Sequence, residues 1–352
     1  MQRKKMLIAV LAIALLVGIV SAATISYFGQ VKMTANVTQA VLVDGHSYPY
    51  VIEETADVAG GESFCKPHWL TSQTSVPVAV KFHRDCYPDG GGITVTYPTA
   101  ILQQRGSGVA GWSTGQVHKG VYSVSLTTVT TDDYARAYIT GEGKTLAQIG
   151  SVSYWSYVTA AENIYVRPWV GIYLDANPTH NTLEQWFTDY SAHNNTAFYI
   201  QAEPCYADGY LGDFDVWQYW DSGGLHPLKW LGLESPDLPY EAPTLQDYIN
   251  GVAMNYPTPY HGNQVFASRE YGSLTVVGMK FMAGYGGTWA NFAGYVDDVM
   301  IGGKTHDLEL FLEDIPFTLQ PSERLDFYIC YKFAENIQGG TYYIYTTVKP
   351  AP

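Results

Sequence analysis

The sequence predicts an all-β protein, a split β-sandwich into which a larger β-domain is inserted. Two observations predict it. Short segments alternate apolar and polar residues with the period of a strand, and the middle of the chain differs in composition from its ends. Eight of the nine tryptophans lie between residues 93 and 304. We therefore place the outer sandwich at residues 24–90 plus 305–352 and the insert at 91–304.

The N-terminus has the order of a cleavable secretory signal over residues 1–23. Basic residues at 3–5 precede an apolar run from Met6 to Val20, and Ser21-Ala22-Ala23 follows it. The run is shorter than the roughly 20 residues that span a bilayer, although an uncleaved anchor is the alternative. The segment predicts a secreted, extracellular protein.

Segments near both ends of the chain predict the strands of the outer sandwich. They share strict alternation or enrichment in β-branched and aromatic residues. These segments are Thr24–Phe28, Val31–Val37, Val78–Phe82 (preceded by Pro77), Leu308–Leu312, Leu325–Phe333 and Thr341–Val348. A turn signal, residues 87–92, closes the first half.

The sequence of the insert also predicts strands, together with only two short helices. Strand patterns cover residues 122–126, 135–139, 163–174 and 272–282. Thr182 is a suitable N-cap for a helix over Leu183–Tyr190, and Thr244 with Asp247 caps a helix that ends at Gly251.

Composition excludes some partners. The formal net charge is −14, and only 15% of residues are charged. An acidic surface of this kind repels nucleic acid and anionic lipid. We therefore expect no nucleic-acid partner.

The four cysteines, Cys65, Cys86, Cys205 and Cys330, leave two interpretations open. An even number in an exported chain favours disulfides, and Cys65 with Cys86 is the most local pair. Cys65, His68, His83 and Cys86 also form a CxxH and an HxxC with the spacing of a tetrahedral zinc site.

The outer domain resembles the exported TasA and camelysin type of β-sandwich subunit, found in bacterial extracellular fibres and archaeal bundling pili. The resemblance lies in the signal ending at Ala22-Ala23, Thr24–Phe28, the strand Val31–Val37, and the patterns at 317–325 and 331–336. In that family the mature N-terminal segment is donated as a strand to the neighbouring subunit. The resemblance therefore implies a homopolymer in which Thr24, Ile25, Ser26, Tyr27 and Phe28 form the donor strand.

The insert resembles the concanavalin-like jelly roll shared by laminarinase-type domains and many carbohydrate-binding modules. Residues 111–124 match an early strand of such modules, and residues 294–303 match their last strand. The resemblance implies a structural Ca²⁺, which we place at Asp297 because one of Asp297 and Asp298 must share a face with apolar neighbours.

Glycan binding by the insert would use aromatic rings for stacking and polar groups for hydroxyls. The candidates are Trp217, Tyr219 and Trp220 with Asp213 and Asp215, and Trp155 and Trp289 lie behind them. The alternative is that these rings form core, as most of the 29 tyrosines and nine tryptophans must.

The sequence predicts a non-enzymatic function. Laminarinase-type hydrolases carry a Glu-x-Asp-x-x-Glu triplet, which is absent here, as is the HExxH of metallopeptidases. We expect a cell-surface filament subunit that polymerises through its N-terminal strand and presents a jelly roll to a glycan or neighbouring cell surface. The alternative is a monomeric secreted protein that binds or hydrolyses carbohydrate.

Overall fold

The computed structural model describes the chain from residue 40 to 351, with gaps. The described residues are 40–47, 50–58, 61, 63–87, 92–141, 143–162, 166–176, 196–204, 213–222, 229–232, 244–251, 254–258, 262–266, 270–285, 289–337 and 340–351. The expected signal, the donor strand Thr24–Phe28, the strand Val31–Val37, the helix Leu183–Tyr190 and Cys205 lie outside them.

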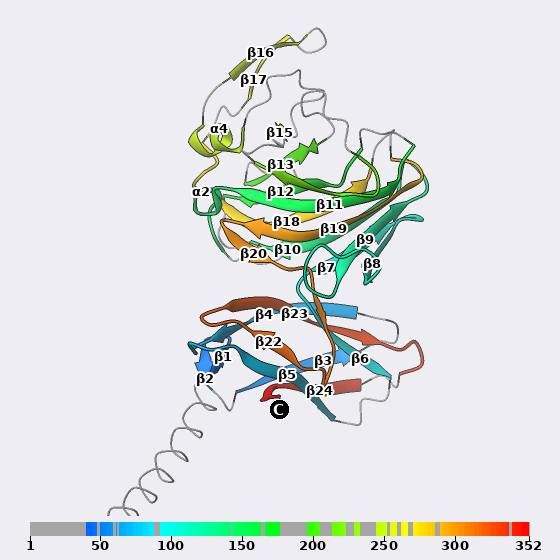
Figure 1. Cartoon of the computed structure of the whole chain (residues 1–352), viewed down its shortest axis with the longest axis vertical. Helices are drawn as coiled ribbons and strands as arrows, with labels where there is room; N and C mark the ends of the chain where they lie inside the picture. Colours follow the sequence, from blue (N-terminus) through cyan, green and yellow to red (C-terminus); the bar gives the residue numbers. More distant parts are fainter. Residues whose placement is uncertain are drawn as a thin grey trace, which may run out of the picture.

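The protein is all-β and consists of two stacked sandwiches (Figure 1). In the small sandwich, sheet I has the strand order β2-β1-β4-β23-β6-β21 and sheet II the order β22-β5-β24-β3. In the large sandwich, sheet III has the order β15-β13-β12-β18-β10-β7 and sheet IV the order β14-β11-β19-β9-β8, with β20 beside β19. All pairings are antiparallel, so the predicted β-sandwich class is confirmed.

The strands of the small sandwich come from both ends of the described chain. They are β1 (Val41–Val43), β2 (His46–Ser47), β3 (Val51–Val58), β4 (Ser63–Ser72), β5 (Val78–Tyr87), β6 (Ile93–Pro98), β21 (Leu310–Phe311), β22 (Phe317–Leu319), β23 (Arg324–Phe333) and β24 (Gly340–Pro350).

The strands of the large sandwich are consecutive in sequence. They are β7 (Ile101–Arg105), β8 (Val109–Ser113), β9 (Ser123–Thr128), β10 (Tyr134–Thr140), β11 (Val152–Ala160), β12 (Trp169–Asp175), β13 (Ala197–Glu203), β14 (Trp217–Asp221), β15 (Lys229–Gly232), β18 (Thr275–Gly284), β19 (Phe292–Ile301) and β20 (Lys304–His306). A separate hairpin joins β16 (Met254–Thr258) and β17 (Gly262–Phe266).

Two short helices begin at capping boxes. The helix α4 (Leu245–Asn250) has Thr244 as N-cap, Asp247 reaching back to it, and Gly251 in the left-handed region at the C-cap, as the sequence predicts. The helix α2 (Leu146–Ile149), capped by Thr145 and Gln148, was not predicted. No described helix is long and apolar enough to cross a membrane.

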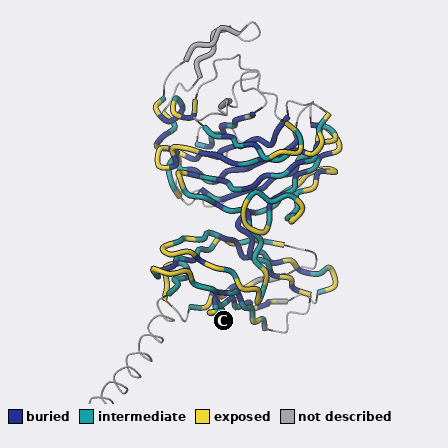
Figure 2. The backbone as a smooth tube through the Cα atoms, viewed as in Figure 1, coloured by how far each residue is buried: buried dark blue, intermediate teal, exposed yellow. Residues whose placement is uncertain are grey.

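Each sandwich has its own hydrophobic core, because alternate strand residues from facing sheets meet between them (Figure 2). In the small sandwich, Phe82, Ile329 and Ile344 are fully buried. In the large sandwich, the buried centre includes Val296 and Phe281.

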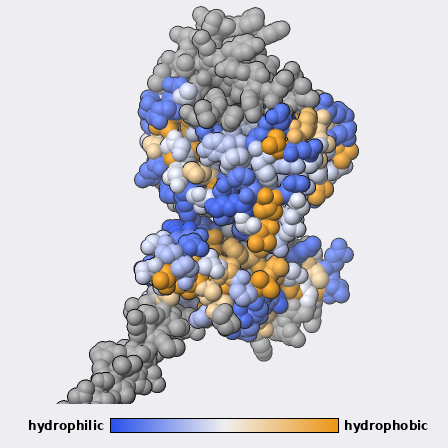
Figure 3. Space-filling view, in the orientation of Figure 1, coloured by the Kyte–Doolittle hydropathy of each residue, from blue (hydrophilic) through white to orange (hydrophobic). Residues whose placement is uncertain are grey.

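The chain passes into the large sandwich after β6 and returns before β21. By number β6 lies within 91–304, yet it pairs with β23 of the small sandwich. The two bodies are joined by side-chain contacts: the Tyr328 hydroxyl accepts from the Thr140 N–H at 2.8 Å, and Lys304 pairs with Asp326. Hydrophobic side chains also lie near this junction (Figure 3).

The disulfide joins Cys65 to Cys330, and the expected pairing of Cys65 with Cys86 is therefore wrong. In the antiparallel register of β4 and β23 the two residues stand directly opposite each other, with 4.1 Å between their Cα atoms. Cys86 lies on β5 in the other sheet, opposite Ile344. Sequence distance misled the expectation because strands from opposite ends of the chain are neighbours.

The zinc site expected at Cys65, His68, His83 and Cys86 does not form. Cys65 is in the disulfide, and the Nδ1 atom of His68 lies 2.8 Å from Asp44 Oδ2. His83 instead lies beside Glu313 and Asp314, the one group of described residues whose ligand atoms are close enough for a metal ion. The Lys81 ammonium already lies 2.9 Å from Asp314 there.

We predict that Cys65→Ser lowers the free energy of unfolding by about 2–5 kcal/mol, because the bond closes a loop of 265 residues in the unfolded chain. Denaturant unfolding, with Cys86→Ser as the control that leaves the bond intact, measures the difference. Non-reducing peptide mapping that found Cys65 linked to Cys86 would contradict the assignment.

Candidate functional site

Sheet IV has one face in the core and one face turned outward. Along β11, Tyr154, Ser156 and Val158 are buried, while Trp155 and Tyr157 are half-buried on the opposite side. This is the period-two alternation of a strand. The outward side chains of β11 therefore belong to a face of the protein and not to its core.

Aromatic rings from three neighbouring strands meet on this outward side. We call this set the aromatic face: Trp155, Tyr157, Trp217, Tyr219 and Tyr295, all half-buried. Trp155 stands opposite Tyr219, and Tyr157 stands between Trp217 and Tyr295, because β11 pairs with β14 on one side and β19 on the other. The ring centroids of Tyr157 and Trp217 are 5.5 Å apart, and those of Trp155 and Tyr219 are 5.3 Å apart.

The structure separates the glycan-binding candidates of the sequence. Trp217 and Tyr219 lie on the aromatic face, whereas Trp220 is 1% exposed and its indole N–H donates to the Ser156 hydroxyl in the core. The expectation that Trp220 stacks on a sugar is therefore wrong, because the alternation of β14 turns this side chain into the core. Trp289 is also buried.

Asp213 and Asp215 lie on the turn that leads into β14, and both are exposed. Asp215 has a φ of 57° and its N–H donates to the Val158 carbonyl, which fixes the turn against β11. Both residues therefore lie on the exposed turn that precedes Trp217 in sequence.

Asp297 lies on the outward side of β19 in phase with Tyr295, and a bulge follows it directly. Asp298 has a φ of 46°, and the register of β11 with β19 shifts between Ser153 and Trp155. Upstream of the bulge Tyr295 faces outward, and downstream Val299 is buried in the core. Simple alternation, which put Asp297 in phase with Val299, fails for this reason.

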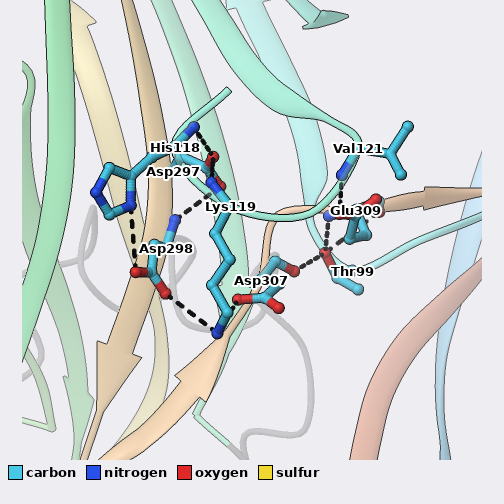
Figure 4. A network of polar contacts seen from close by, with 8 residues as sticks. All are labelled: Thr99, His118, Lys119, Val121, Asp297, Asp298, Asp307 and Glu309. Atoms are coloured by element: carbon cyan, nitrogen blue, oxygen red, sulfur yellow. Dashed lines mark hydrogen bonds and ion pairs between the residues drawn. The ribbon is translucent and has the colours of Figure 1, made fainter. Parts of the chain in front are cut away.

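Asp297 holds a loop that crosses the aromatic face. We call residues 114–122, between β8 and β9, the strap. The Oδ2 atom of Asp297 accepts from the N–H groups of His118 at 2.8 Å and Lys119 at 3.0 Å (Figure 4). The His118 ring stacks on Trp155 with 4.0 Å between centroids. The strap therefore places an imidazole on the aromatic face.

A second carboxylate holds the far end of the strap. Glu309 Oε1 accepts from the Val121 N–H at 2.6 Å, and the Glu309 N–H donates to the Thr99 hydroxyl (Figure 4). Between the two ends, the Lys119 ammonium lies 3.1 Å from Asp307 and 3.8 Å from Asp298. Residues between β20 and β21 thus fix the strap to the junction of the two sandwiches.

Burial dominates the electrostatics of these two carboxyls. It raises the pKa of Asp297 to about 6 and that of Glu309 to about 7, although the backbone N–H donors act in the opposite direction. The carboxyl groups therefore titrate close to neutrality.

The arrangement does not fit the calcium expected at Asp297. Both carboxylate oxygens already accept backbone N–H groups, those of His118 and Lys119 at Oδ2 and that of Asp298 at Oδ1. A cation there would face N–H donors and the nearby Lys119 ammonium instead of oxygen ligands. The buried Asp297 has its partner in the strap.

Sequence reasoning missed Tyr157, Tyr295 and His118. The alternation of Trp155 with Tyr157 in a β-branched and aromatic segment could have identified β11 and its outward rings. The stacking of His118 could not have been found, because it depends on the carboxylate across the sheet.

Comparisons with known proteins add little to this site. The sequence matches no protein-family model and no curated protein. One solved structure, from a study of the structural basis for the promiscuous specificity of carbohydrate-binding modules of the β-sandwich superfamily, is similar at a TM-score of 0.26 and 10% identity. The match covers 68% of this chain and 74% of that one. The TasA and camelysin resemblance stays a prediction.

The titration of the strap carboxyls predicts a pH dependence. In the folded protein Glu309 and Asp297 keep their protons up to about pH 6–7, whereas in the unfolded chain the same groups lose them near pH 4. Proton binding by these two groups therefore stabilises the fold fully below about pH 4, and this stabilisation is lost as the pH rises through about 6–7. Glu309→Gln removes one titration and keeps an acceptor for Val121. The melting temperature of this variant should gain roughly 2–6 °C on the native protein between pH 5 and 8.

Thermal unfolding followed by circular dichroism at each pH measures this difference. Glu53→Gln, at an exposed position on β3, is the matched control and should keep the pH profile of the native protein. The same profile for Glu309→Gln would contradict the raised pKa.

Proposed function

We propose that this is an exported surface protein that binds glycan, without hydrolysing it, on the aromatic face of sheet IV. The observation that carries the proposal is the set of half-buried rings that three neighbouring strands place on one outward face. Aromatic rings that a sheet holds in fixed positions lose little entropy when a sugar stacks on them.

The surroundings of the rings supply the polar groups that sugars require. Asp298 and the His118 ring lie at one side, with 3.4 Å between Oδ2 and Nδ1, and the exposed Asp213 and Asp215 lie by β14. Carboxylates accept from sugar hydroxyls, while ring faces stack on C–H groups. The face therefore combines both kinds of contact.

The supporting arguments for export are the N-terminal signal pattern and the disulfide between Cys65 and Cys330. Disulfides persist outside the reducing cytoplasm. Surface display gives a glycan-binding face access to polysaccharide or to a neighbouring cell.

The first test is a glycan array with the native protein and Trp217→Ala. The variant should bind any glycan that the array identifies at least roughly tenfold more weakly, because a stacking ring contributes on the order of 1.5 kcal/mol beyond its area. The matched control is Tyr343→Ala, which removes an exposed ring from β24 of the small sandwich. The bound glycan should be recovered intact.

Two outcomes would overturn this proposal. One is full glycan affinity of a folded Trp217→Ala, Tyr157→Ala double variant. The other is loss of binding in Tyr343→Ala, which would move the site to the small sandwich.

Polymerisation is the second candidate function, and the edge of sheet II favours it. Among the described residues β3 pairs only with β24, so the opposite edge of Val51–Val58 offers N–H and C=O groups to another strand. We propose that the segment Thr24–Phe28 of a second copy supplies this strand by β-augmentation.

Deletion of Thr24–Phe28 tests this second candidate. The truncated chain should remain monomeric in light scattering and electron microscopy, while the mature chain forms filaments. Filaments of unchanged length from the truncated chain would refute the donor-strand model.

A further inference from the structure

The outward face of sheet III carries a second cluster of polar and aromatic groups. Sheet III lies across the core of the large sandwich from sheet IV. By alternation Tyr134, Arg136 and Tyr138 of β10 lie on the side of the sheet turned away from sheet IV, where Arg136 and Tyr138 are buried and Tyr134 is half-buried. Gln103 on β7 stands opposite Arg136. Because β7 is the edge strand, Arg136 lies one strand in from the rim of the sheet.

The Arg136 guanidinium is held by neutral groups. Its Nε donates to Gln103 Oε1 at 2.8 Å, and its Nη1 donates to the Tyr173 hydroxyl at 3.1 Å. The guanidinium carbon lies 4.9 Å from the ring centroid of Tyr134. These three contacts fix the plane of the guanidinium, and no hydrogen bond joins Nη2 to another of the described residues.

No carboxylate of the described residues forms an ion pair with Arg136, which is only 9% exposed. Burial raises the pKa of Tyr173 to about 12, so its hydroxyl stays protonated and does not neutralise the charge. A buried cation without a counter-ion is costly. The free-energy cost of the buried Arg136 charge falls when an anion from solution binds beside the guanidinium.

The surroundings indicate what kind of anion would fit. Arg105, the residue opposite Tyr134 on the edge strand, is exposed and lies over Tyr285, which adds a second cation at the rim. Lys280, two residues along β18 from the partner of Arg136, is enclosed by the rings of Trp169 and Tyr199. A guanidinium fork matches a planar carboxylate, and tyrosine rings with an amide suit a sugar.

We propose that Arg136, with Gln103, Tyr134 and Tyr173, forms a subsite for the carboxylate of a uronic acid residue in an acidic glycan. This subsite is separate from the aromatic face and goes beyond the function proposed above. The protein as a whole has a net charge of −14. Non-specific attraction of polyanions is therefore excluded, and an acidic glycan needs a specific cationic subsite of this kind.

The test is calorimetric titration of the mature chain with a galacturonate hexamer and with its methyl ester. The ester keeps the sugar rings and removes the charge. The native protein should bind the acid more tightly than the ester. Arg136→Gln should weaken binding of the acid by about ten- to a hundredfold and leave the ester unchanged. Arg136→Lys, which keeps the charge but loses the fork, should fall between them.

Two controls separate this subsite from other effects. Arg324→Gln removes the same charge from the small sandwich, where Arg324 already pairs with Asp326, and should bind the acid like the native protein. Tyr343→Ala, which removes an exposed ring from β24, should also bind the acid like the native protein. Trp217→Ala should weaken the binding of acid and ester by the same factor. Loss of the preference for the acid in Trp217→Ala, with that preference kept in Arg136→Gln, would place the uronate on the aromatic face and overturn the proposal.

A third measurement covers the case in which Arg136→Gln does not fold. The Nε–H resonance of Arg136 in the native protein should shift when the galacturonate hexamer is added, and should not shift with the ester. Equal binding of acid and ester, an unshifted resonance, or a response to inorganic sulfate but not to galacturonate would show that the assignment is wrong.

Discussion

The hydrogen bonds from the strap to Asp297 are the interaction on which the candidate site depends. They turn residues 114–122 back over sheet IV and bring the His118 ring onto Trp155. The carboxylate can take this role because Asp297 lies in phase with Tyr295 on the outward side of β19, and the bulge at Asp298 then turns Val299 back into the core. The position of one carboxylate thus fixes the strap over the aromatic face.

The two sheets of the large sandwich present different chemistry. Sheet IV combines half-buried rings with the carboxylates of Asp298, Asp213 and Asp215, and this combination suits neutral sugars. Sheet III carries Arg136 and Lys280 among tyrosines and tryptophans. Because alternate residues of every strand point to opposite sides, one sandwich can hold two outward faces without disturbing the core between them.

The all-β fold, the late strands β23 and β24 and the cap of α4 could be predicted from alternation and capping residues alone. Trp217 and Tyr219 were also found. The disulfide partner of Cys65, the inward turn of Trp220 and the strap could not. Each of them depends on which distant strand lies next to which, and a local pattern carries no such information.

The central claim is that a sugar stacks on the aromatic face, and a crystal structure of the protein with an oligosaccharide selected on a glycan array tests it most directly. The account predicts a sugar ring in contact with Trp217 or Tyr157, with hydroxyls near Asp298 or the strap. A sugar bound only elsewhere, with the aromatic face bare, would contradict it.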